Sequence, residues 1–136
     1  MFRVGPLACA AHAEAVREIL PRLPTIRIPG APPVVAGLVN VRGSLVTVVE
    51  GWRALDQQGT ADGGTTVLLE VGADRRALGF TVDEVLDLLA IPDDQLEPRQ
   101  TLPGLDPRLV RAVGRRGGQV FVVLDTEALL APILTS

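Results

Sequence analysis

The apolar residues of this chain fall in short runs that turn signals separate, and most of the runs are rich in Val and Leu. Runs of this length and composition, bounded by Gly, Pro, Asn or Asp, are typical of β-strands. Two of them, TTVLLEV and VFVVLD, show little polar alternation, as expected of strands with both faces buried. The pattern predicts strands at residues 2–4, 38–41, 45–49, 66–71, 77–82 and 120–124.

Helical signal is confined to three short stretches. Residues 11–20 (AHAEAVREIL) are good helix formers closed by Pro21, and residues 126–130 begin with Thr126, a residue type suited to an N-cap. Residues 107–113 predict a turn of helix with Pro107 near its first position. Many short strands with few helices predict a mostly β barrel or sandwich.

Glycine- and proline-rich segments mark the connections. Residues 72–76 lie between two predicted strands and predict a hairpin. Residues 57–65 (QQGTADGGT) predict an insertion-tolerant loop, and the acidic residues 91–103 predict a loop that crosses the surface.

The most informative segment is residues 28–43, IPGAPPVVAGLVNVRG. Gly43 directly follows Arg42, and glycine adopts tight-turn conformations at little steric cost. The turn would therefore hold Arg42 at a bend between two buried strands. Arg suits recognition because its planar fork binds carboxylates and stacks on aromatic rings. From spacing alone, a solvated β-turn and a recognition anchor are equally good interpretations.

Composition narrows the class of protein. The 136 residues, 47% of them hydrophobic, fit one domain with a sizeable core. The net charge of −3 and the scarcity of aromatic residues argue against binding to nucleic acid. No apolar run approaches the ~20 residues that cross a bilayer, and no secretory signal is evident. The single cysteine excludes an internal disulfide, so a cytoplasmic location is expected.

Candidate chemistry is sparse. Cys9 and His12 lie three residues apart, but two ligands do not make a metal site, and ordinary packing positions are favoured. The segment GRRGGQ lacks a phosphate-loop pattern and favours a basic hairpin. Asp93, Asp94 and Glu97 form an acidic loop for which a solvated surface is favoured over acid–base catalysis. We therefore expect no enzymatic activity, no metal and no cofactor.

Five segments in order carry a resemblance to a known family: FRVG, AVREIL, IRIPGAPPVVAGLVNVRGSLVTVVE, LGFTVDEVLDLLAI and GQVFVVLDTEALL. Together they resemble the CheW-like domain of bacterial chemosensory systems over essentially the whole chain. The resemblance implies one domain, residues 1–136, of two interleaved lobes. Each lobe would be a small SH3-like five-stranded β-barrel, and the two would share a hydrophobic core with short helices.

The same resemblance implies a non-enzymatic adaptor that couples the cytoplasmic tip of a methyl-accepting chemoreceptor to the regulatory domain of a CheA-type histidine kinase. Other CheW-like proteins are further expected partners, and recruitment to receptor clusters is expected. The implied partner-binding residues are Arg42 with Asn40 and Gly43 of its turn, Val16, Glu18 and Gly37 on the receptor-facing side, and Val85 and Leu88 on a second docking surface. Val16, Val85 and Leu88 are equally compatible with core positions, and Gly37 with a purely backbone role.

Two departures from the family pattern leave an alternative open. Only Met1 precedes Phe2, which predicts a truncated or absent first strand and an uncovered sheet edge that would allow weak self-association. Glu50 and Gly51-Trp52 replace an Asp and an apolar–basic pair that are usual in the family. The alternative is an accessory CheW-like protein that binds receptors or other CheW-like proteins without the kinase.

Overall fold

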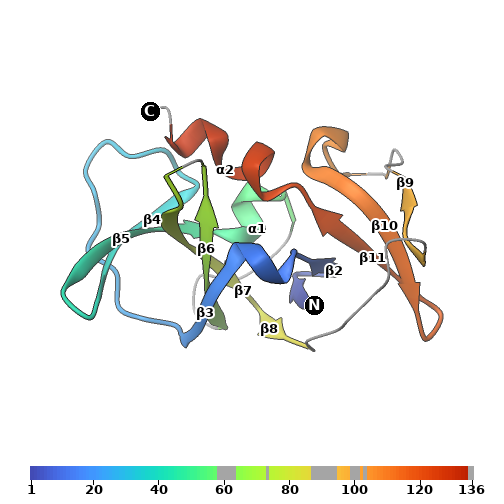
Figure 1. Cartoon of the computed structure of the whole chain (residues 1–136). Coiled ribbons are helices and arrows are strands. Elements are labelled where there is room, and N and C mark those ends of the chain that lie inside the picture. Colours follow the sequence, from blue (N-terminus) through green and yellow to red (C-terminus); the bar gives the residue numbers. More distant parts are fainter. Residues whose placement is uncertain (58–63, 73, 87–94, 99–101, 103, 135–136) are drawn as a thin grey trace.

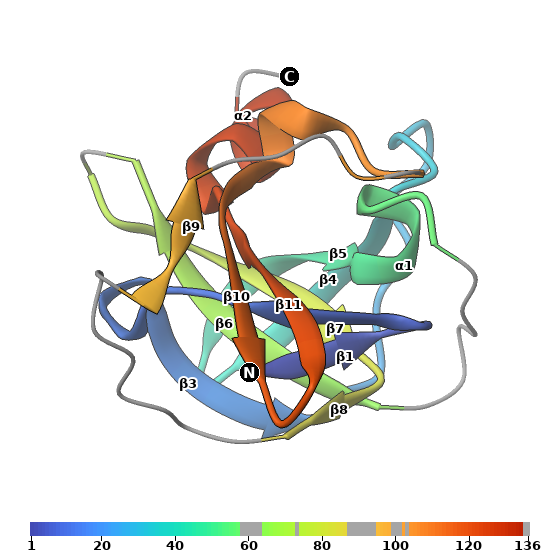
Figure 2. The same ribbon diagram turned by 90° about the vertical axis from the view of Figure 1, so that its right-hand side faces the viewer.

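The computed structural model describes residues 1–57, 64–72, 74–86, 95–98, 102 and 104–134. Two mixed, mostly antiparallel sheets lie side by side. The five-stranded sheet is on the left of Figure 1 and the six-stranded sheet is on the right. Figure 2 views the molecule from the side of the six-stranded sheet and shows its β10–β11 hairpin in front. Leu88, Asp93 and Asp94, named above as candidates, lie outside the described residues.

The five-stranded sheet is assembled from the middle of the chain. Its strand order is β3-β6-β7-β5-β4, in which β5 and β7 are parallel and the other pairs are antiparallel. Its strands are β3 (Val16–Pro21), β4 (Val35–Val41), β5 (Ser44–Glu50), β6 (Thr65–Val71) and β7 (Arg76–Val82).

The six-stranded sheet joins both ends of the chain. Its order is β8-β1-β2-β11-β10-β9, and the β2–β11 pair is parallel. Its strands are β1 (Phe2–Val4), β2 (Leu7–Ala10), β8 (Glu84–Val85), β9 (Glu97–Pro98), β10 (Val110–Arg116) and β11 (Gln119–Leu124). The prediction was a truncated or absent first strand that leaves a sheet edge uncovered. Strand β1 is present with three residues and has β2 on one side and β8 on the other, so an absent strand and an uncovered edge at this position are both wrong.

Three short helical segments lie between strands: η1 (Ala13–Ala15), α1 (Gly51–Ala54) and η3 (Pro107–Leu109). Helix α2 (Thr126–Leu134) follows the last strand, β11. Helix α2 lies across one end of the molecule and contacts both β6 and η3 (Figures 1 and 2). Its N-cap is Asp125, not the predicted Thr126, because the Asp125 carboxylate accepts a hydrogen bond of 3.0 Å from the Ala128 N–H. Among the described residues, no helix is long and apolar enough to cross a membrane.

One apolar cluster joins the two sheets. Val4 and Val122 enter it from the six-stranded sheet, Leu69 and Phe80 from the five-stranded sheet, and Leu130 from α2. Strands β6 and β11 each bury both faces, since alternate side chains reach different clusters. This confirms the interpretation of the two continuous apolar runs.

All six predicted strands are observed, most of them a residue or more longer than predicted, and so are the 72–76 hairpin and the basic hairpin at Gly117-Gly118. The helix predicted at residues 11–20 is wrong. The chain makes one 3₁₀ turn there and then forms β3, in which half-buried and exposed residues alternate strictly. Pairing with β6 outweighs the local helix propensity of these residues. Likewise, the turn at residues 107–113 covers only η3, after which β10 begins.

The predicted closure of each sheet into an SH3-like barrel is not confirmed. Each strand order has two distinct ends, and among the described residues no backbone pairing joins them. The mostly β architecture with two sheets and few helices is what the sequence predicted. The five-stranded sheet nevertheless curls, since Leu20 of its first strand and Val39 and Val41 of its last strand share one apolar cluster.

Candidate functional site

The candidate site is built on the turn between β4 and β5. Val41 pairs with Ser44, so the loop consists of Arg42 and Gly43 alone. Both residues have positive φ, 51° and 86°, as in the type I′ turns that match the twist of a hairpin. The Asn40 side-chain oxygen accepts a hydrogen bond of 2.7 Å from the Gly43 N–H and steadies the turn. The rigid support predicted for Arg42 is therefore present.

Arg42 is an unusual residue for this position. The left-handed region strains any residue with a Cβ, and Asn, Asp and Gly are the residues that usually occupy it. Strained residues gather at functional sites, where the surrounding structure holds them in place. The Arg42 side chain is 71% exposed, so burial does not explain its presence.

Glu18 of β3 is the partner of Arg42. The two Nη atoms of Arg42 donate to the two carboxylate oxygens of Glu18, one of them at 2.7 Å, in a bidentate ion pair. This hydrogen bonding and the charge of Arg42 lower the pKa of Glu18, so the carboxylate stays ionised at neutral pH. Because β3 and β4 are the two ends of the five-stranded sheet, the pair joins ends that no backbone pairing joins among the described residues.

Exposed apolar side chains occur near this pair in the sequence and in the sheet. Leu45 follows the turn and is 64% exposed, and Ile19 follows Glu18 and is half exposed. Ile26 is also exposed and bridges Leu38 of β4 through two backbone hydrogen bonds. Sequence reasoning did not single out these residues, although the alternation of exposed Leu45 and half-buried Thr47 with buried Val46 and Val48 was a readable signal.

The other receptor-side candidates have structural roles. Gly37 is buried at a register shift of β4 with φ of 149°, and a Cβ there would lie 2.4 Å from the Ile26 carbonyl oxygen. The surrounding backbone therefore requires glycine at this position. Val16 is half-buried and packs against the core shared by the two sheets.

Val85 lies away from the Arg42 turn, on the six-stranded sheet. It ends the edge strand β8, pairs with Phe2 and is exposed, as is the adjoining Leu86. The structure thus separates the candidates into the Arg42–Glu18 pair on one sheet and Val85 on the other, while Leu88 lies outside the described residues.

Cys9 and His12 occupy different environments. Cys9 is buried in the core, and burial raises the pKa of its thiol to about 12, whereas His12 is exposed at the start of η1. Within the ranges that the structure describes, no three His, Cys, Asp or Glu side chains gather as metal ligands would.

The reactivity of the Cys9 thiol tests whether Cys9 is buried in the folded protein. At pH 8 we expect a thiol reagent to modify Cys9 only as the protein unfolds, because thiolate is the reacting form. The pKa of the Cys9 thiol is about 12 in the folded state and near 9.0 in the unfolded chain. As the pH rises, the thiol therefore loses its proton at a lower pH in the unfolded chain than in the folded protein. The free energy of unfolding should then fall from pH 9 towards 12. Modification of the native protein as fast as that of the urea-unfolded chain would contradict the prediction.

Comparison with known proteins places these features in a family. A family model described as the CheW-like domain matches residues 1–133. The chain belongs to the CheW-like domain family. The resemblance read from the sequence is therefore confirmed, and the CheW-like domain spans essentially all of the chain.

Curated relatives share the CheW-like domain. The chemotaxis protein CheW of Rhizobium meliloti (strain 1021) is 31% identical over 129 residues, which cover 94% of this chain and 83% of that protein. The chemotaxis protein CheW of Klebsiella aerogenes is 27% identical over 132 residues, 96% of this chain and 80% of that protein. The fold is similar to the crystal structure of the scaffolding protein TtCheW from Thermoanaerobacter tengcongensis, with a TM-score of 0.85 and 18% identity, covering 95% of this chain and 88% of that one.

Proposed function

We propose that this CheW-like protein is a non-enzymatic adaptor that couples the cytoplasmic tip of a chemoreceptor to the regulatory domain of a CheA-type histidine kinase. Family membership supports the adaptor role, and the relatives are chemotaxis proteins by name. The observation that carries the choice of site is Arg42, an exposed cation on a strained turn and beside exposed Leu45. In this proposal the protein is cytoplasmic and is recruited to receptor clusters.

The chemistry of the site suits a reversible protein interface. Arg is enriched among residues that dominate binding energy, and the contacts around such residues exclude water. The bidentate pair with Glu18 engages one hydrogen on each Nη atom, so Arg42 retains further N–H groups and both faces of its guanidinium for a partner. Glu18 thus positions the side chain and lowers the entropy lost on binding.

The presence of β1 supports kinase coupling over the accessory alternative. That alternative was based in part on a truncated or absent first strand, and β1 is instead present and paired on both sides. Glu50, another departure, lies largely buried and accepts a hydrogen bond of 2.9 Å from Arg53, which is a structural role. Val85 and, in this proposal, Leu88 belong to the second docking surface.

Titration of the purified protein separately with the receptor cytoplasmic region and with the kinase regulatory domain tests the proposal. Both should bind, and Arg42→Asn should weaken at least one affinity by about tenfold or more. Asn is the better probe than Ala because it tolerates positive φ, so the turn is kept. Arg111→Asn, at an exposed position of β10, is the control for loss of one charge. Receptor binding alone would favour the accessory role, and unchanged affinities for Arg42→Asn would refute the site.

A further inference from the structure

The chain passes from one sheet to the other through a single residue. Strand β7 of the five-stranded sheet ends at Val82, and strand β8 of the six-stranded sheet begins at Glu84. Asp83 is therefore the whole connection at this point. A connection of one residue leaves the chain little conformational freedom. The backbone angles of Asp83 and the contacts of its side chain therefore affect the angle between the two sheets.

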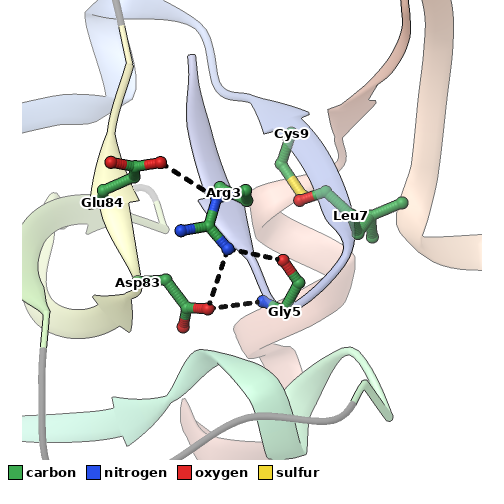
Figure 3. Close-up of polar contacts among 6 residues, drawn as sticks. All are labelled: Arg3, Gly5, Leu7, Cys9, Asp83 and Glu84. Carbon is green, nitrogen blue, oxygen red and sulfur yellow. Dashed lines mark hydrogen bonds and ion pairs between the residues drawn. The ribbon is translucent and has the colours of Figure 1, made fainter.

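Three contacts hold Asp83, all from the first five residues of the chain, and Figure 3 shows the two that its side chain makes. Its backbone N–H donates to the Arg3 carbonyl at 2.8 Å. Its Oδ2 accepts from the Gly5 N–H at 3.0 Å and lies 3.4 Å from Arg3 Nη1. The Asp83 side chain is 30% exposed, so these bonds are partly shielded from water.

Arg3 ties the joint to both neighbouring segments. Its Nη1 also donates to the Gly5 carbonyl at 3.0 Å, and its Nε donates to Glu84 at 3.0 Å (Figure 3). One guanidinium therefore connects the β1–β2 turn, the joint and β8. Directly beside Arg3, the Phe2 ring meets Phe80 of β7 edge to face, with centroids 6.1 Å apart. Two kinds of contact therefore hold the sheets together at this joint. One is the polar network of Arg3, Gly5, Asp83 and Glu84, and the other is the apolar contact between Phe2 and Phe80.

The polar network requires a carboxylate side chain at position 83. Such a side chain accepts from a backbone N–H and a guanidinium at once and neutralises the Arg charge. An amide at position 83 retains an acceptor for Gly5 but loses the charge that attracts Arg3. The Glu84–Arg3 pair differs, because both residues belong to paired strands of one sheet and Glu84 is more exposed.

We infer that Asp83 is a positioning residue that fixes the angle between the two sheets. The angle sets the spacing between the Arg42 turn on one sheet and Val85 on the other. The importance of this spacing rests on the proposed function, in which both are docking sites. A partner that contacts both would then depend on Asp83 without touching it.

Distance measurement between spin labels in the free protein tests this inference. Labels at Ser44→Cys and Gln119→Cys, in a Cys9→Ala background, report one hairpin tip from each sheet. Asp83→Ala should give a broader distance distribution with a second, shifted population. Glu84→Ala removes the same charge and the other Arg3 pair but should leave the distribution unchanged.

Asp83→Asn provides a second variant, since it is isosteric and retains the Gly5 contact. It should fold and show a smaller broadening of the same kind. A distribution identical to that of the parent in folded Asp83→Ala, or in Asp83→Asn if the alanine variant does not fold, would overturn the inference. A loss of thermal stability alone would indicate a merely structural role. Because no partner is present, failure of receptor or kinase binding leaves this result intact.

Discussion

Replacing Gly51 by alanine is expected to destabilise the protein by about 3 kcal/mol, near the upper end for an overpacked core. Gly51 is buried at the start of α1, where its N–H donates to Thr81 Oγ1. A Cβ there would lie 2.1 Å from the Thr81 carbonyl oxygen and 2.8 Å from the Phe80 ring. The carbonyl belongs to β7 and cannot move without breaking the sheet, so the strain cannot be relieved locally.

Urea unfolding of Gly51→Ala and the parent protein measures this effect. Gly30→Ala is the control, because a Cβ at Gly30 meets nothing within 4 Å but the residue has φ of 78°. That variant carries conformational strain without a clash and should lose only about 1 kcal/mol. Equal losses in the two variants would show that steric contact at Gly51 is not the cause.

Gly51 also shows what the sequence could and could not predict. Next to Trp52 it looked like a departure from the family pattern, yet the need for glycine arises from β7, thirty residues later in the chain. The strands of continuous apolar residues were predictable because burial on both faces leaves a local pattern. Strand β3 was not, because AHAEAVREIL favours a helix locally and only pairing with β6 makes it a strand.

The candidate site also has one feature that was predictable from the sequence and one that was not. The tight turn at Arg42 was predictable from Asn40 and Gly43, whose residue types are local turn signals. The Arg42–Glu18 contact was not, because it depends on the strand order that places β3 and β4 at opposite ends of one curled sheet. The resemblance named both residues but gave no reason for them to meet. The recognition-anchor and the solvated-turn interpretations therefore both missed an intramolecular partner.

Reversing the charge at position 42 should have the largest effect on binding. Arg42→Glu removes the proposed anchor and places a second carboxylate beside Glu18, so affinity for the partner that uses this site should fall by about thirtyfold or more. Isothermal titration against the receptor region and the kinase regulatory domain measures it. Arg111→Glu, at an exposed position of β10, is the matched charge reversal and should change affinity far less.

A double variant separates the two roles that Arg42 can have. Glu18→Arg with Arg42→Glu restores an ion pair between β3 and β4 but presents an acid at the turn. If Arg42 contacts the partner, this variant should recover thermal stability relative to Arg42→Glu and still bind weakly. Recovery of binding together with stability would show instead that the pair acts only by holding the ends of the sheet together. Because the pair is exposed, raising the salt concentration should weaken the stability difference more than any apolar part of the interface.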